Sequence, residues 1–191
     1  MTMRADLLNH AETLARTRGI DAFSYADLAA ATGIRKASVH YHFATKADLT
    51  LALIEDYSTR IVETLDHMKD QSANAASALA GFLSLYRNAL GDGDSLCLCV
   101  AFSASTDSLP ATTLARVETF RHDVTDWLAG QFQRAREDGS IREVTDPRKE
   151  AAALFALVEG AQLVARAARN SDRFTDAVSQ FSDRLIMGVT Q

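Results

Sequence analysis

The sequence contains few residues that interrupt helices. Among 191 residues there are only two prolines and nine glycines, so we expect long uninterrupted helices. No stretch approaches the roughly 20 consecutive apolar residues that span a bilayer, and the N-terminal residues lack the apolar run of a secretory signal. We therefore expect a cytoplasmic protein without a membrane partner.

The sequence also lacks the motifs of the common enzyme classes. It has no glycine-rich phosphate loop, no histidine and carboxylate pair at metal-ligand spacing, and no Ser, His and acid set with the local context of a hydrolase. Asp92 and Asp94 lie in a glycine-rich turn, but the residues after them offer no oxygen ligands for calcium. We expect no catalysis, no metal and no cofactor, and an all-α enzyme or small-molecule carrier is the least favoured alternative.

The chain lacks the overall positive charge of many nucleic-acid-binding proteins, because its formal net charge is −5. That charge is unevenly distributed. Residues 1–48 contain six Lys and Arg and five Asp and Glu, which gives +1 and leaves −6 for the remainder. This asymmetry fits a small nucleic-acid-facing domain attached to an acidic body.

Residues 23–49 are the most informative stretch. Ser24 begins a predicted short helix, and Asp27 follows three residues later, which is the spacing of reciprocal N-terminal capping. Gly33 then occupies a position where a left-handed residue commonly ends a helix. A second short helix follows this tight turn, so the pattern predicts a helix-turn-helix.

The second helix of this motif, about residues 36–43, has two distinct faces. On a helical wheel Val39 and Phe43 point into the core, whereas the opposite face is polar, aromatic and cationic. That face can donate to phosphate oxygens and approach base edges in a major groove. Lys46 adds a cation at the capped start of the next helix, where a phosphate would be stabilised. The residues predicted to bind DNA are Ser24, Tyr25, Arg35, Lys36, Ala37, Ser38, His40, Tyr41, His42 and Lys46.

Several of these positions resemble the DNA-binding domain of TetR/AcrR-family repressors. The resemblance rests on Leu28-Ala29, Gly33-Ile34, Tyr41-His42-Phe43, Lys46 and Leu49, and it is specific over about residues 5–50. Two positions depart from the family pattern. Arg35 replaces a common Ser or Thr helix cap, and His40 replaces a tyrosine that usually contacts phosphate, which would make that contact pH-sensitive.

The resemblance implies an all-α protein of about nine helices. A three-helix DNA-binding domain would occupy residues 1–48, and a larger effector-binding and dimerisation domain residues 49–191. The protein would be a dimeric transcriptional repressor that a small-molecule effector of unknown identity releases from a palindromic double-stranded DNA operator. Apolar periodicity predicts the further helices at about residues 46–68, 75–90, 110–137, 147–168 and 172–189.

An apolar effector cavity between the body helices is a further implication of the resemblance. Its aromatic candidates are also compatible with plain core packing. Glu159 and Gln162 are polar exceptions in an apolar helix, either at a structural contact or as hydrogen-bonding groups for the effector. The candidate effector-binding residues are Phe82, Tyr86, Cys97, Phe102, Phe120, Trp127, Phe155, Glu159 and Gln162.

Cys97 and Cys99 are the only cysteines in the chain. A disulfide between positions two apart would be strained, and two thiolates alone cannot complete a tetrahedral zinc site. Core packing is the favoured interpretation. The alternative is a regulator that senses oxidants or electrophiles through these thiols.

The last two predicted helices have the pattern of a dimer interface. One carries a stripe of small or modest side chains on which a partner helix could lie close, and the other has a short heptad-like seam. We expect a twofold homodimer in which the two helices of each subunit form an intermolecular four-helix bundle. The predicted interface residues are Ala156, Gly160, Val164, Phe174, Val178, Phe181 and Leu185.

Overall fold

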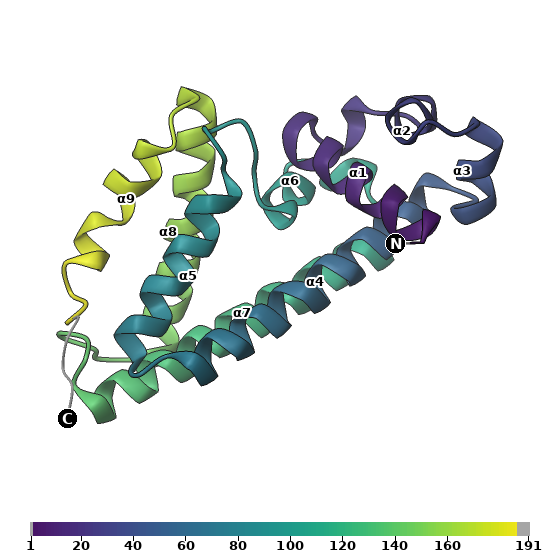
Figure 1. Cartoon of the computed structure of the whole chain (residues 1–191). Coiled ribbons are helices and arrows are strands. Elements are labelled where there is room, and N and C mark those ends of the chain that lie inside the picture. The colour runs from purple at the N-terminus through teal and green to yellow at the C-terminus, as the bar shows by residue number, and fades with distance from the viewer. Residues whose placement is uncertain (1, 187–191) are drawn as a thin grey trace. The chain divides into compact units, whose positions relative to one another are not determined.

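The computed structural model describes residues 2–186 (Figure 1), and this part of the chain contains nine α-helices, two short 3-10 helices and no strand. The predicted all-α class is confirmed. The helices form two compact units, one made of residues 1–59 and 97–120 and the other of residues 60–96 and 121–191. We call them unit 1 and unit 2.

Unit 1 contains the predicted helix-turn-helix. Helix α1 begins after Thr2, whose hydroxyl accepts the amide of Ala5. It buries an apolar stripe that includes Leu7 and Ala11, and it contacts α2 and α6. The elements that lie wholly in this unit are α1 (Met3–Arg18), η1 (Ile20–Ala22), α2 (Tyr25–Thr32), α3 (Lys36–His42), α6 (Leu98–Ser103) and η2 (Thr106–Ser108).

Two long helices, α4 (Lys46–Gln71) and α7 (Ala111–Asp138), contribute to both units. In unit 1 the hydroxyls of Thr50 and Thr113 lie 3.3 Å apart, and both residues are buried. The rings of Tyr57 and Phe120 meet edge to face with centroids 5.7 Å apart. The start of α4 is therefore packed against the start of α7.

Unit 2 contains α5 (Ala75–Ala89), α8 (Pro147–Ala168) and α9 (Asp172–Ser182) together with the second halves of α4 and α7. Figure 1 shows α9 next to α8, with α5 alongside, and these three helices contact one another. Asp146 caps α8 by accepting the amides of Arg148 and Lys149. Leu185 pairs with Ile141 in an isolated antiparallel bridge, which ties the segment after α9 to the segment after α7.

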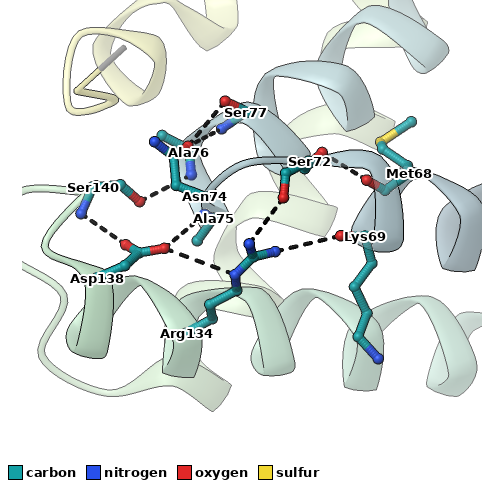
Figure 2. Close-up of polar contacts among 10 residues, drawn as sticks. All are labelled: Met68, Lys69, Ser72, Asn74, Ala75, Ala76, Ser77, Arg134, Asp138 and Ser140. Atoms are coloured by element: carbon teal, nitrogen blue, oxygen red, sulfur yellow. Dashed lines mark hydrogen bonds and ion pairs between the residues drawn. The ribbon is translucent and has the colours of Figure 1, made fainter. Parts of the chain in front are cut away.

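A polar cluster joins the ends of α4 and α7 to the start of α5 (Figure 2). The guanidinium of Arg134 donates to the backbone oxygens of Lys69 (3.4 Å) and Ser72 (2.9 Å), which lie at the C-terminal end of α4. Asp138 accepts the backbone amides of Ala75 (2.8 Å) and Ser140 (2.9 Å). A cation therefore satisfies the free carbonyls of one helix, and a carboxylate caps the N-terminus of the next.

The predicted helix bounds agree with the structure except in three places. Helix α4 continues to Gln71 rather than Met68, and α6 at Leu98–Ser103 was not predicted. The last helix was predicted to reach residue 189 but ends at Ser182, because Ile186 donates its amide to Ser140 (2.8 Å) instead of continuing the helix. Residues 187–189 lie outside the described part of the chain.

Candidate nucleic-acid interface

Helix α2 begins with the reciprocal capping that the sequence indicated. The hydroxyl of Ser24 accepts the amides of Ala26 and Asp27, and the Asp27 carboxylate accepts the amide of Ser24 at 2.8 Å. Hydrogen bonds from the Ser24 hydroxyl and amide are the main reason why the pKa of Asp27 lies below its ordinary value. Gly33 ends the helix at φ 70°, in the left-handed region, which fixes the turn into the next helix.

Helix α3 presents a polar face to solvent. Val39 is fully buried and Phe43, just after the helix, is 2% exposed, so these two residues hold α3 against the rest of unit 1. Tyr41 is 87% exposed, and Lys36 and Ala37 are exposed as well. The residue before the helix, Arg35, makes no side-chain capping bond. This leaves the amides of the first turn of α3 without a side-chain acceptor from that position.

A concave site of about 280 Å³ lies at the junction of α2, α3 and α4. Two lysines and one histidine line it, and no acidic side chain does. The lining residues are Phe23, Ser24, Tyr25, Lys36, His40 and Lys46. Because the capped starts of α2 and α4 lie at the same junction, cationic side chains and helix N-termini converge there, which is the chemistry that binds a phosphate.

Lys46 and Tyr25 hold this site together. The Nζ of Lys46 donates to the backbone oxygen of Phe23 at 2.9 Å. The hydroxyl of Tyr25 donates to the backbone oxygen of Thr45 at 2.5 Å. Burial, and to a smaller extent the Asp48 carboxylate, raises the pKa of Tyr25 to about 12, so this hydroxyl remains a donor at neutral pH. Tyr25 is only 7% exposed, so its main role is to join α2 to α4.

His40 lies on the exposed face of α3 and lines the same site. Its ring meets the ring of Tyr25 edge to face at 4.7 Å between centroids. Its Nδ1 lies 3.3 Å from the backbone oxygen of Ala44 and donates to that oxygen in the tautomer that carries the proton on Nδ1. In the neutral ring Nε2 is then a hydrogen-bond acceptor. It becomes a donor only when the ring is protonated.

The structure brings some of the predicted effector residues together. In unit 2 the ring of Phe82 lies 4.7 Å from that of Tyr86 and 5.9 Å from that of Trp127, and the ring of Tyr86 lies 6.3 Å from that of Phe155. These four residues form one aromatic cluster. Cys97, Phe102 and Phe120 are buried in unit 1 instead.

The two polar candidates on α8 have different surroundings. Glu159 accepts a hydrogen bond from Arg121 at 2.8 Å, as part of an ion pair. Burial raises the pKa of Glu159, and the attraction of Arg121 opposes that rise. Gln162 is fully buried. The structural interpretation of Glu159 is therefore supported by a defined partner within unit 2.

The predicted dimer residues fall into two groups. On α8, Val164 is 55% exposed, and Ala156 and Gly160 are exposed too. The residues of the predicted seam on the last helix are different. Phe174 is 1%, Val178 4% and Phe181 7% exposed, and Leu185 is half-buried beyond the end of α9. Within one subunit Phe174, Val178 and Phe181 therefore pack in the interior of unit 2, where the ring of Phe181 meets that of Phe132 at 5.8 Å between centroids, and their place in a dimer interface stays a prediction.

Two features of unit 2 have no signal in the sequence. Leu157 and Leu163 on α8 are 37% and 49% exposed and extend the apolar stripe of Val164. Gln131 is 2% exposed, and none of the residues 2–186 gives its Oε1 a hydrogen-bond partner. The helical wheel of α8 is apolar on almost every side. Which side remains exposed to solvent depends on how α5 and α9 pack against the helix, and the sequence alone does not show this.

Comparisons with known proteins agree with this geometry. Residues 7–53 match the profile described as bacterial regulatory proteins, tetR family, and residues 75–181 match the tetracyclin repressor-like C-terminal domain. A search of curated proteins gives no match.

Several solved structures superpose over nearly the whole of this chain. A TetR-family transcriptional regulator from Agrobacterium tumefaciens has 27% identity and a TM-score of 0.89, with 96% of this chain and 97% of that chain covered. A TetR transcriptional regulator from Legionella pneumophila has 28% identity and a TM-score of 0.85, with 96% of each chain covered. The reduced form of NemR from E. coli, at 21% identity, has a TM-score of 0.84 with 98% of each chain covered, and shows the shared fold alone. The profile matches, which together cover the helix-turn-helix and most of the helical body, show that this chain belongs to the TetR family of bacterial regulatory proteins.

Proposed function

We propose that this DNA-binding regulator is a homodimeric repressor that a small-molecule effector releases from a palindromic operator. The observation that carries the proposal is the site where Lys36, His40 and Lys46 converge beside the exposed Tyr41. Within the proposal, residues 1–48 bind DNA, and residues 49–191 bind the effector and the second subunit.

Helix α3 would enter the major groove with its exposed face toward the bases. Ala37 and Ser38 are small enough to let the helix approach base edges closely. Lys46 would hold a flanking phosphate, since a lysine ammonium has three donors and only one is given to Phe23. Phosphate contacts fix the position of the helix, and contacts from α3 to the bases select the sequence.

The second subunit would dock on the exposed apolar face of α8. Gly160 lies in the middle of this helix, where glycine costs about 1 kcal/mol relative to alanine. A Cβ built at Gly160 would meet no atom within 4 Å, so the fold of one chain does not require a glycine there. The α8 helix of a second subunit could cross close to Gly160, between Leu157 and Leu163. Such a crossing would explain why a glycine is present at this position, and it would cover the exposed leucine side chains.

Effector binding would act through α4. This single helix starts at Lys46 in unit 1 and ends at Gln71 in unit 2, so a change in its direction in the body would move the DNA-binding surface. The effector needs only to bind the DNA-incompetent arrangement more tightly, and DNA must then weaken effector binding by the same factor.

The alternative input, a thiol sensor built on Cys97 and Cys99, receives less support. Both side chains are at most 1% exposed, and Cys97 accepts the amide of Val100 at 3.4 Å as the cap of α6. Reactive thiols are normally accessible. A double variant, Cys97→Ser with Cys99→Ser, that keeps its effector response would remove this alternative.

The proposal is tested by selecting bound duplexes from a random DNA pool, measuring their affinity by fluorescence anisotropy, and screening metabolites for release. We expect enriched sequences with two inverted half-sites. Enrichment of no sequence, or of single unrepeated sites only, would contradict the proposal.

A further inference from the structure

A groove of about 380 Å³ lies between the second half of α4 and α7 within unit 2. Its size falls within the range of small-molecule sites, about 300 to 1,000 Å³. Val62 and Leu65 supply an apolar wall, and Trp127, the only tryptophan of the chain, lies opposite them on α7. The indole is fixed in place, because its Nε1 donates to the backbone oxygen of Leu65 at 3.0 Å and its ring stacks on Phe82.

The charges of the groove are predominantly negative. Three carboxylates line it, from Asp66, Asp123 and Asp126, against the single ammonium of Lys69. Asp126 lies 3.2 Å from the His122 imidazole and forms an ion pair with Arg148 at 3.9 Å. Asp66 and Asp123 have no ion-pair partner in the described part of the chain. An excess of carboxylate over ammonium favours a cationic ligand.

Gln131 supplies a second and independent indication of a ligand. It lines the groove, it is 2% exposed, and its Oε1 has no hydrogen-bond donor among residues 2–186. A buried amide oxygen without a donor is costly, and such groups are normally satisfied by a hydrogen bond. A ligand that donates hydrogen bonds would satisfy this amide.

The third observation concerns Gly130. It lies in the middle of the 28-residue helix α7, and a Cβ built there would meet no atom within 4 Å. It lines this groove and also a neighbouring one of about 570 Å³ that shares Asp126. The packing of one chain therefore does not require a glycine at this place, whereas a side chain here would project into the groove and obstruct a bound molecule.

From these three observations we infer that this groove binds an organic cation with a hydrogen-bonding head, such as an amidinium, guanidinium or ammonium group, on an apolar body. The head pairs with Asp66 and Asp123 and donates to Gln131, and the body lies along Val62, Leu65 and Trp127. An inorganic metal ion fits less well, because no group of three or more His, Cys, Asp or Glu side chains in the described residues is placed to hold one.

The groove also has a regulatory consequence, which rests on the proposed function. One wall of the groove is the second half of α4, the helix that begins at Lys46. A cation bound there contacts the helix that carries a DNA-binding residue, and it acts as an effector if it favours a different direction of α4.

The test compares two probes of nearly the same shape, 4-butylbenzamidine, which is a cation at neutral pH, and the neutral 4-butylbenzamide. Binding to the full chain without DNA is measured by titration calorimetry and by the fluorescence of Trp127. We expect the amidine to bind and to shift the Trp127 emission, with an affinity that falls as salt is added, and the amide to bind at least about tenfold more weakly.

Two groove variants and one control complete the test. Asp66→Asn with Asp123→Asn is expected to weaken amidine binding about three- to tenfold. Gly130→Leu is expected to abolish it while the helix content and unfolding midpoint stay at least as high, because leucine favours helix more than glycine. Asp70→Asn, an exposed change on the same helix outside the groove, should leave binding unchanged.

Equal binding of the two probes, no binding of the amidine, or full binding by a folded Gly130→Leu variant would each overturn the inference. None of these results depends on DNA. Binding without any change in operator affinity would confirm the cation site and contradict only its proposed role as an effector site.

Discussion

The ammonium of Lys46 donates to the backbone oxygen of Phe23 and lies 4.9 Å from the centre of the Phe23 ring. This contact joins the first residue of α4 to the segment that leads into α2. It holds the ammonium at the junction where the starts of these two helices meet, so Lys46 serves both as a tie within unit 1 and as a cation for a DNA phosphate.

Replacing Lys46 by alanine should weaken binding to every DNA sequence rather than to one. We expect the slope of log affinity against log salt to become shallower by about one unit, because one phosphate contact is lost. Fluorescence anisotropy over a salt series measures this slope. Lys149→Ala removes an exposed lysine far along the chain in unit 2 and is the matched control. An unchanged slope in Lys46→Ala would argue against the phosphate contact.

Changes on the exposed face of α3 should alter which sequence is preferred. Ser38→Ala or Lys36→Gln is expected to cost about 1 to 3 kcal/mol on the selected operator and to relax the preference at one base pair of each half-site. Repeating the random-pool selection with each variant shows the altered position directly. If each variant lost affinity equally for all DNA sequences and still selected the same operator, these residues would not contact bases in the major groove.

Asp138→Asn should lower the free energy of unfolding by about 1 kcal/mol at pH 7, as expected for the loss of a charged helix cap. Burial alone would raise the pKa of Asp138, but hydrogen bonds from Ser140 and Ala75, together with Arg134, hold the pKa below its ordinary value of 3.8. The stabilising contribution of the Asp138 carboxylate is therefore fully present above about pH 4, and it is lost as the pH falls through the lowered pKa.

Urea unfolding of both proteins at pH 7 and at successively lower pH measures this contribution. The difference between Asp138→Asn and the unaltered protein should shrink in acid. Asp70→Asn, an exposed change near the end of α4, serves as the control for a general effect of charge. A difference that stays constant down to pH 3 would show that the carboxylate charge is not what stabilises the start of α5.

Val164→Asp should disrupt the proposed dimer without unfolding the chain, because Val164 is 55% exposed in a single subunit. A carboxylate in a covered apolar contact is strongly unfavourable unless it is paired. Equilibrium sedimentation at micromolar concentration should show a dimer for the unaltered protein and a monomer for this variant. Thr175→Asp, on the exposed side of α9, is the control. A monomeric unaltered protein would contradict the α8 interface.

Local sequence patterns predicted the elements of the DNA-binding surface well. The helix cap formed by Ser24 and Asp27 and the helix end at the left-handed Gly33 each depend on only a few consecutive residues. The sequence therefore suffices to predict them, and the structure shows both. Val39 and Phe43 could be assigned to the core because a short helix has only one side that can be buried.

Patterns of longer range were less informative. The seam of Phe174, Val178 and Phe181 has the same spacing whether it faces a partner subunit or the chain's own core, and only the packing of α9 on α5 and α8 decides between them. Helix α6 is six residues long, too short for periodicity to reveal. Gln131 and Gly130 stand out only once the neighbouring atoms are placed, because an unpaired oxygen or an open Cβ position has no sequence signature.

The central claim is that the exposed face of α3 lies on duplex DNA in two subunits at a fixed separation. A photo-crosslinking phenylalanine analogue at position 41, on the selected operator, tests it most directly, with an analogue at position 175 as the control. We predict crosslinks from position 41 at two symmetric places, one in each half-site, separated by about one helical turn, ~34 Å, or a modest multiple of it. No crosslink from position 41, or crosslinks scattered along the duplex as for position 175, would contradict the claim.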